Sequence, residues 1–328
     1  MATIVGAYAA SPANAAWKEA EEQAFYDGLK AMPSVRGLEI PFTGALHPHD
    51  EAWLLRTVKK NWDFVVTCIP GTMQTLVKDK TFGLASDDAA GRKRAIDFAA
   101  KAKDAVGRIN AAAGRNAVIA VEVQSAPTQG GEGKGSAGAF GESLAEIAGW
   151  DWQGARIVIE HCDAYRAGHP PIKGFLTLDG ELKAIAAANK SARKPIGISI
   201  NWGRSVLETY KAETAVQHIK QARDAGALSG LMFSGASGAQ TPYGAWADAH
   251  MPHAAAPGLS HAAEGSLLTE TEIKASLAAA GTLDFVGAKI GIRPPEATVA
   301  TRLGLIGDVI IAKVTNEILQ PTSFSSVR

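Results

Sequence analysis

Short apolar runs recur along the chain and alternate with alanine-rich segments of helical periodicity. The runs are rich in β-branched residues and predict strands at residues 3–7, 36–42, 62–68, 116–127, 155–164, 195–203, 229–237 and 284–295. The segments between them predict helices at residues 13–32, 50–60, 91–113, 180–189, 213–225, 270–280 and 296–319. Strands that are apolar along their whole length are typical of a parallel sheet buried on both faces.

Eight strand–helix units favour an α/β fold of the (β/α)8 TIM-barrel type, with residues 1–328 forming a single domain. A doubly wound sheet needs fewer units and a glycine-rich phosphate-binding turn after its first strand, and the segment VGAYAASP is no such turn. Long loops follow the fourth strand (residues 128–138) and the seventh strand (residues 235–266). Both lie where barrel enzymes build active sites, so each is either a mobile lid or an ordinary surface insertion.

Composition narrows the class of protein. Hydrophobic residues make up 46% of the 328 residues, and 33 basic residues balance 33 acidic ones. A chain without net charge has no field that draws it to nucleic acid or to an anionic membrane, so a small molecule is the expected partner. Two widely separated cysteines, Cys68 and Cys162, exclude a disulfide framework. With neither a signal peptide nor a membrane-spanning run, we expect a cytoplasmic protein.

Polar residues at the ends of the predicted strands are the candidates for chemistry, because barrel enzymes react at the carboxyl ends of their strands. They are Tyr8, Glu39, Thr67, Cys68, Glu122, Gln124, Glu160, His161, Asp163, Asn201, Arg204, Ser234, Ser237, Lys289 and Arg293. Among them, and with Trp246 of the second long loop added, the candidates for substrate binding are Tyr8, Glu39, Gln124, His161, Asn201, Arg204, Ser234, Trp246 and Arg293.

Glu160, Lys289 and Glu122 are the candidates for catalysis. Glu122 stands among valine and alanine, where a carboxylate is costly unless it has a function or pairs with Lys289 or Arg293. Burial of Lys289 could adapt it to acid–base chemistry, or it could form a salt bridge with a strand-end carboxylate. His161 alternates to the opposite side of its strand from Glu160, so it either binds substrate or packs against the helix layer.

The segment HPHDEAW offers a pair of possible metal ligands, His47 and His49, two residues apart in a loop. Asp50 is a natural helix N-cap. Without further ligands in the pattern, the metal signal is weak, and we assign no metal ligand.

The layout resembles the xylose isomerase-like barrel superfamily of sugar isomerases, epimerases, lyases and endonucleases. GLEIPF in the second strand and IVIEHCDA in the fifth are similar to glutamate-bearing strands of that group, and IVGAYAASP is similar to the start of an uncharacterised bacterial family within it. The resemblance in architecture covers nearly the whole chain, whereas the motifs cover only a few residues.

The resemblance implies a divalent ion held by an acidic residue after the fifth, sixth and eighth strands and a histidine after the seventh. Glu160 matches the first ligand, but Asn201, Ser234 and Lys289 stand at the other three positions. A lysine ammonium repels a metal ion, so we expect no complete metal site and name no cofactor.

We therefore expect a sugar isomerase or epimerase that could act without the usual divalent metal. Lys289 would polarise a carbonyl while Glu160 moves a proton, and Arg204 and Arg293 suit an anionic group on the sugar.

Three alternatives stay open: a lyase acting on a keto-sugar or glycoside, a sugar-binding protein, and a partner subunit that has lost its metal site. A retaining glycosidase fits less well, because Glu122 suits the fourth strand but the seventh strand offers no carboxylate. The balanced charge argues against an endonuclease. The apolar outer helices allow a homo-oligomer.

Overall fold

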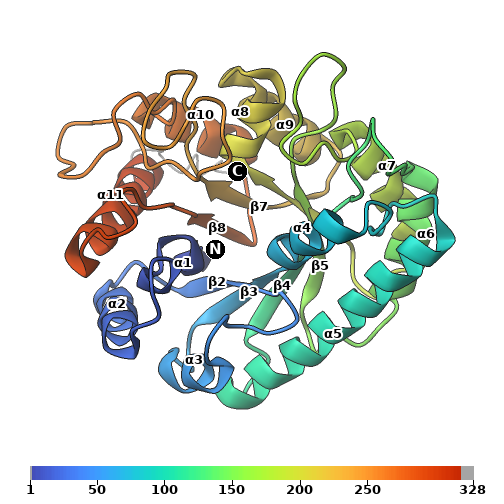
Figure 1. The fold of residues 1–328 in the computed structure, drawn as a ribbon, viewed down its shortest axis with the longest axis horizontal. Coiled ribbons are helices and arrows are strands. Elements are labelled where there is room, and N and C mark those ends of the chain that lie inside the picture. Colours follow the sequence, from blue (N-terminus) through green and yellow to red (C-terminus); the bar gives the residue numbers. More distant parts are fainter. Residues whose placement is uncertain (1, 319–328) are drawn as a thin grey trace, which may run out of the picture.

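Eight parallel strands close into one barrel in the computed structural model, which describes residues 2–318 (Figure 1). The strands are β1 (Ala2–Val5), β2 (Gly37–Pro41), β3 (Asp63–Thr67), β4 (Val118–Val123), β5 (Arg156–His161), β6 (Gly197–Asn201), β7 (Leu228–Phe233) and β8 (Phe285–Ala288). Each strand pairs with its neighbour in sequence, and β8 pairs with β1. The predicted (β/α)8 barrel is confirmed.

Helices surround the barrel on its outside (Figure 1). They are α1 (Ala7–Ala10), α2 (Glu19–Ala31), α3 (Glu51–Thr57), α4 (Ile69–Lys78), α5 (Ala89–Ala113), α6 (Ala137–Ala148), α7 (Leu178–Ala188), α8 (Trp202–Thr209), α9 (Glu213–Asp224), α10 (Glu270–Ala280) and α11 (Val299–Ile318), with a 3-10 turn at Pro12–Asn14. No helix of residues 2–318 is long and apolar enough to cross a bilayer.

The strand predictions located every strand but made several of them too long. The fourth predicted strand, residues 116–127, shortens to Val118–Val123, and the eighth, residues 284–295, shortens to Phe285–Ala288. In both cases the prediction continued into the loop after the strand. The last predicted helix begins at Val299 instead of residue 296, and residue 319 lies outside the described part of the chain.

Four helices that pack on the barrel, α1, α4, α6 and α8, were missing from the prediction. Each begins within a few residues of a strand or a glycine-rich loop, where turn residues obscure the helical period. Helix α6 nevertheless has a visible start, because the hydroxyl of Ser136 accepts a hydrogen bond from the Ala139 N–H at 3.2 Å.

The interior of the barrel changes character along its axis. Near the amino ends of the strands it is filled by an apolar cluster of Ile4, Val65, Ala120, Val158, Met232 and Phe285. Nearer the carboxyl ends the inward positions carry Glu39, Glu122, Glu160 and Ser199, followed by Lys289 just after β8. The apolar half is a packed core, and the charged half is the place to look for chemistry.

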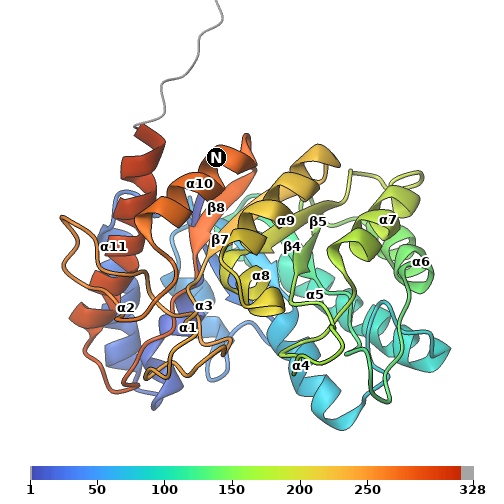
Figure 2. The ribbon, with the colours of Figure 1, turned by 90° about the horizontal axis from the view of Figure 1, so that it is seen from above.

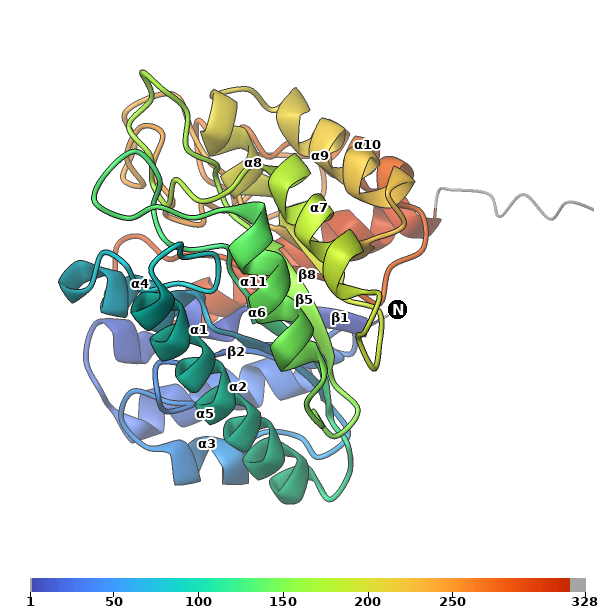
Figure 3. The same ribbon diagram turned by 90° about the vertical axis from the view of Figure 1, so that its right-hand side faces the viewer.

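Long loops after β4, β5 and β7 lie together over the carboxyl end of the barrel. Figures 2 and 3 show these loops and α4 at the end opposite the N-terminus. Asp163 anchors the loop after β5, because its carboxylate accepts N–H bonds from Ile172, Lys173 and Gly174 at 2.9–3.1 Å. The Lys173 ammonium then reaches Asp248 of the loop after β7, at 2.9 Å. The three loops form one connected cover.

Candidate active site

Five charged residues converge inside the carboxyl half of the barrel: Glu39, Glu122, Glu160, Arg204 and Lys289. We call them the barrel ion cluster. All are at most 2% exposed. The Lys289 ammonium lies 2.7 Å from a Glu39 oxygen and 3.0 Å from a Glu160 oxygen. The structure thus brings Lys289 and Glu160 together and adds Glu39 to the pair.

Glu160 is the most strongly bound carboxylate of the cluster. One of its oxygens accepts from Lys289 at 3.0 Å and from Arg204 at 2.5 Å. The other accepts from Thr67 at 2.9 Å and from Gln124 at 3.2 Å. Burial alone would raise the pKa of Glu160, but these charges and hydrogen bonds outweigh it and lower the pKa to about 2. An anion this stable anchors the two cations and is a poor proton acceptor.

The pKa of Glu122 is shifted in the opposite direction from that of Glu160. Burial raises its pKa well above the ordinary range, and the negative charges of Glu160 and Glu39 raise it further. Oxygens of the three carboxylates lie within 4.8 Å of one another, so one of the three is expected to hold a proton. Glu122 is that residue, because its partner is the Ser199 hydroxyl at 2.6 Å and not a cation.

Glu39 is intermediate between these two extremes. Burial raises its pKa, whereas the ammonium of Lys289 opposes the rise. Neither of its oxygens has a hydrogen-bond partner of good geometry among the described residues. The end of β1 approaches the pair closely at Gly6, where an added Cβ would lie 2.8 Å from Glu39 and 2.9 Å from Lys289. Glycine is therefore needed there.

Arg204 connects the cluster to the loop cover. Its Nη1 binds Glu160 and its Nε donates to Asp248 at 3.1 Å, where Lys173 also binds. The charge of Asp248 is stabilised by these two cations, which lower its pKa well below the ordinary range although burial opposes them. The cover is thus tied electrostatically to the barrel interior.

A cavity of about 190 Å³ opens beside the cluster, between the ends of β1, β2 and β3. It is smaller than the roughly 300–1,000 Å³ pockets that hold drug-sized ligands, so a compact molecule fits best. Glu39 is the one cluster member among its lining residues. Tyr8 also lines the cavity, with its ring 5.6 Å from the Lys289 ammonium. Burial raises the pKa of the Tyr8 hydroxyl, which is therefore a neutral hydrogen-bond donor.

Two further cavity residues were not assigned a role from the sequence. Glu22 is 1% exposed, accepts from the Ser11 hydroxyl at 2.8 Å, and has its pKa raised by burial. Its only signal in the sequence was a place in a predicted amphipathic helix. His47 was considered as a metal ligand, but its Nδ1 accepts the N–H groups of His49 at 3.2 Å and Asp50 at 2.9 Å. The other ring nitrogen carries the proton and is a donor at the cavity wall.

His47 should also make the stability of the protein depend on pH. Burial lowers its pKa from 6.5 to about 4. Between these two pH values the unfolded chain gains a proton at this position and the folded chain does not, so the free energy of unfolding falls as the pH falls. His47→Asn retains an acceptor and should remove up to about 3 kcal/mol of this loss. Urea unfolding of both proteins at pH 7 and pH 4 measures it, and equal losses would contradict the assignment.

The remaining predicted residues lie outside the cluster. Asn201 caps α8 by accepting from the Arg204 N–H at 3.3 Å, and it accepts from Ser234 at 2.8 Å. Trp246 stacks on Tyr210 with ring centroids 4.5 Å apart.

Two more predicted residues point elsewhere. Arg293 is exposed and lies over the ring of Tyr243. His161 faces the helix layer, away from Glu160, as its alternation along the strand allowed. Direct substrate contact through these side chains finds no support in the geometry.

A cavity of about 800 Å³ lies at the opposite end of the barrel, where the strands begin. Its wall includes both partners of the ion pair Arg156–Asp284 and the aspartate of the pair Arg115–Asp63. In barrel enzymes this end serves stability, so we place the active site at the other end.

Comparison with known families identifies the chain. Residues 4–305 match the model of the family described as "Domain of unknown function (DUF4862)". The chain belongs to this family. The uncharacterized protein STM3670 of Salmonella typhimurium is 38% identical to this chain over 312 residues, which cover 94% of this chain and 95% of that protein.

Solved structures of xylose isomerase-like TIM barrels share the fold of this chain. A xylose isomerase domain containing protein from Salmonella typhimurium superposes with a TM-score of 0.59 at 9% identity, covering 95% of this chain and 97% of that one. D-psicose 3-epimerase from Clostridium cellulolyticum, solved with D-tagatose, superposes with a TM-score of 0.54 at 14% identity, covering 97% of this chain and 99% of that one. An IolI protein with a bound zinc atom superposes with a TM-score of 0.57 at 10% identity, covering 96% of this chain and 99% of that one. At these identities the likeness concerns the fold.

The barrel interior of this DUF4862 protein does not suit a divalent ion. Glu39, Glu122 and Glu160 have the spacing of a metal-binding group. However, the Lys289 ammonium already bridges Glu39 and Glu160, and the Arg204 guanidinium also binds Glu160. A divalent ion there would meet two cations, and Asn201 and Ser234 are bonded to each other. The ammonium and guanidinium place two positive charges beside the Glu160 carboxylate.

Proposed function

We propose that this DUF4862 protein is a sugar isomerase- or epimerase-like enzyme that transfers a proton beside the carbonyl of a small sugar or sugar derivative, without a divalent metal. The fold is shared with a D-psicose 3-epimerase, although at 14% identity. The proposal depends on the site and not on the fold, since the same barrel supports many chemistries.

One observation carries the proposal. Glu39 is both a member of the barrel ion cluster and a wall of the cavity. Its pKa is raised by burial, which brings a carboxylate closer to the basicity that proton transfer near neutral pH requires. The Lys289 ammonium lies against only one of its oxygens, Oε1, at 2.7 Å, so we assign the acceptance of a proton from a bound molecule to the other oxygen, Oε2.

The proposed step is an enolisation. The Glu39 carboxylate takes a proton from the carbon next to the carbonyl, and the electron pair of that C–H bond forms a carbon–carbon double bond. The carbonyl electrons move to oxygen, whose developing charge is stabilised by the Tyr8 hydroxyl and the His47 N–H at the cavity wall. Protonation of the same carbon by water on the opposite face, with the proton on Glu39 passing to the hydroxide that remains, gives an epimer. Return of the proton from Glu39 to the neighbouring carbon, while the hydroxyl proton moves from one oxygen to the other, gives an isomer.

The other cluster residues position Glu39. Lys289 holds the carboxylate at 2.7 Å, and Glu160 holds Lys289 in place. Glu122 carries a proton close to Glu39 and can supply it if the catalytic carboxylate must be protonated again. These are the three residues that the sequence singled out for catalysis, with Glu39 moved from binding substrate to transferring the proton.

Deuterium exchange tests the function. The purified protein is incubated in D2O with a panel of aldoses, ketoses and their phosphates, and deuterium at the carbon beside the carbonyl is followed by NMR and mass spectrometry. We expect incorporation with at least one compact sugar, together with a new isomer or epimer. A thermal shift without any incorporation would identify a sugar-binding protein instead. No shift and no incorporation across the panel would contradict the proposed substrate class.

A further inference from the structure

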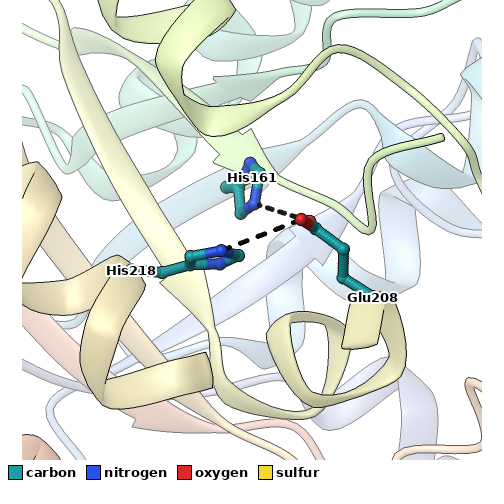
Figure 4. Close-up of side chains that lie close together, drawn as sticks. All are labelled: His161, Glu208 and His218. Atoms are coloured by element: carbon teal, nitrogen blue, oxygen red, sulfur yellow. Dashed lines mark ion pairs between the residues drawn. The ribbon is translucent and has the colours of Figure 1, made fainter. Parts of the chain in front are cut away.

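A second group of buried polar residues lies outside the barrel, between β5 and the helices that pack on it. It consists of His161 at the end of β5, Glu208 of α8 and His218 of α9, and we call it the outer histidine cluster (Figure 4). His161 Nε2 is 3.5 Å from one Glu208 oxygen, and His218 Nε2 is 3.9 Å from the other. Figure 4 shows both rings directed at the carboxylate. One ligand atom from each residue lies within 4.8 Å of the other two.

Hydrogen bonds at the far side of each ring fix the imidazole tautomers. His161 Nδ1 is 2.7 Å from Glu181 of α7, and His218 Nδ1 is 3.1 Å from the Ser205 hydroxyl of α8. If each Nδ1 donates its proton there, both Nε2 atoms present lone pairs to the same point. A histidine that donates its second N–H to a carboxylate is the usual arrangement around bound metals.

His161 Nε2 is left without a hydrogen-bond partner. His161 is 0% exposed, and no donor or acceptor of the described residues satisfies this nitrogen with good geometry. Buried polar atoms of this kind are uncommon and call for an explanation, such as an ion. The nitrogen faces Glu208 and His218, so the missing partner belongs between these three residues.

Charge balance points to a divalent cation. Glu181 is fully buried and the Glu208 side chain is 12% exposed, and no lysine or arginine nitrogen in the described part of the chain lies within 4 Å of either carboxylate. With both histidines neutral, the group carries two negative charges in a medium where an unpaired charge is costly. One proton on His161 would cancel half of this charge. One divalent cation would cancel all of it.

We propose that His161, Glu208 and His218 bind one zinc ion. Imidazole nitrogen at about 2.0–2.1 Å and carboxylate oxygen at about 2.0–2.2 Å are typical zinc ligands, and tetrahedral geometry then separates ligand atoms by about 3.4 Å. The ligand atoms of the three residues lie within 4.8 Å of one another, and rotation of the side chains must bring them to this separation. A water molecule completes the fourth position. The ion joins β5 to α8 and α9 and is separate from the barrel ion cluster, so the site is structural and independent of the proposed catalysis.

Zinc titration of the full-length protein tests the proposal. Chelator-treated wild type is titrated with zinc chloride against a competing chromophoric chelator, and we expect one equivalent bound. Cobalt(II) in place of zinc should give the intense visible absorption of a tetrahedral site. Thermal unfolding should move to higher temperature with added zinc, because the ion binds the folded state. Binding of less than a tenth of an equivalent, or an octahedral cobalt spectrum, would overturn the proposal.

Variants locate the ion. His218→Ala and Glu208→Gln should each lose the bound equivalent. Glu181→Gln leaves the three ligands in place but removes the carboxylate that binds His161 Nδ1, and it should weaken binding about 10–100-fold. The matched control, His49→Ala, removes a histidine of the other histidine pair and should leave the stoichiometry at one. Unchanged binding in His218→Ala would refute the site.

The proposal stays testable even if the cluster variants do not fold. Wild type with 15N-labelled histidine then decides, since zinc should shift the Nε2 signals of two of the eight histidines. If zinc shifts none of these signals, the site does not exist.

Discussion

Replacing Lys289 with methionine is expected to lower the free energy of unfolding by about 3–5 kcal/mol, the range found when one partner of a buried ion pair is removed. Methionine fills a similar volume, so the loss is electrostatic. Glu160 keeps Arg204 as a partner, whereas Glu39 loses its only cation within 4 Å among the described residues. Urea unfolding at pH 7 measures the effect.

A double variant separates this charge effect from a general loss of packing. Lys289→Met combined with Glu39→Gln removes one positive and one negative charge together and should recover at least half of the lost stability. A loss below about 1 kcal/mol in the single variant would mean that Lys289 is not essential to the cluster. A double variant no more stable than the single one would show that packing, and not charge, is the cause.

Glu39→Gln is expected to reduce the rate of deuterium incorporation by about 10²–10⁴-fold, the usual contribution of a general base, while the protein stays folded. Glutamine has the same size and can still accept a hydrogen bond from Lys289, but it cannot take up a proton. The rate with the best substrate of the sugar panel is compared with wild type, and circular dichroism verifies the fold.

The pH profile gives a second reading of the same residue. A base must be ionised to act, so the wild-type rate should rise with pH, with a midpoint above the 4.5 of an ordinary glutamate because burial raises the pKa of Glu39. The matched control is Glu142→Gln, an exposed glutamate on α6, which should leave rate and profile unchanged. Retained exchange in Glu39→Gln would remove Glu39 as the base and leave the enolisation without its acceptor.

The sequence was sufficient to predict the barrel, because eight strands with a regular spacing and a parallel, buried character leave few other folds. Alternation also placed Glu160 and His161 on opposite faces of β5. What the pattern did not contain was the helices α1, α4, α6 and α8, which start too close to strands and glycine-rich loops for periodicity to separate them. Their capping residues, such as Ser136 and Asn201, were the available signals.

The candidate site was only partly predictable for a related reason. Lys289 and Glu160 were expected to meet, since both follow the carboxyl ends of strands. The hydrogen bonds that separate the pKa values of Glu160 and Glu122 come from Thr67, Gln124 and Ser199, and they depend on strand register. In the outer histidine cluster, Glu208 and His218 lie on helices 47 and 57 positions after His161, beyond the reach of any local pattern.

The charged interior of the barrel also limits how the DUF4862 sequence can change with time. Glu39, Glu160, Arg204 and Lys289 neutralise one another in the buried interior of the barrel, so losing any one of them exposes the rest to an unbalanced field. Single exchanges in this group are penalised, and only coordinated exchanges are tolerated. We therefore expect the four positions to be inherited as a unit, and lineages that abandon the chemistry to lose them together.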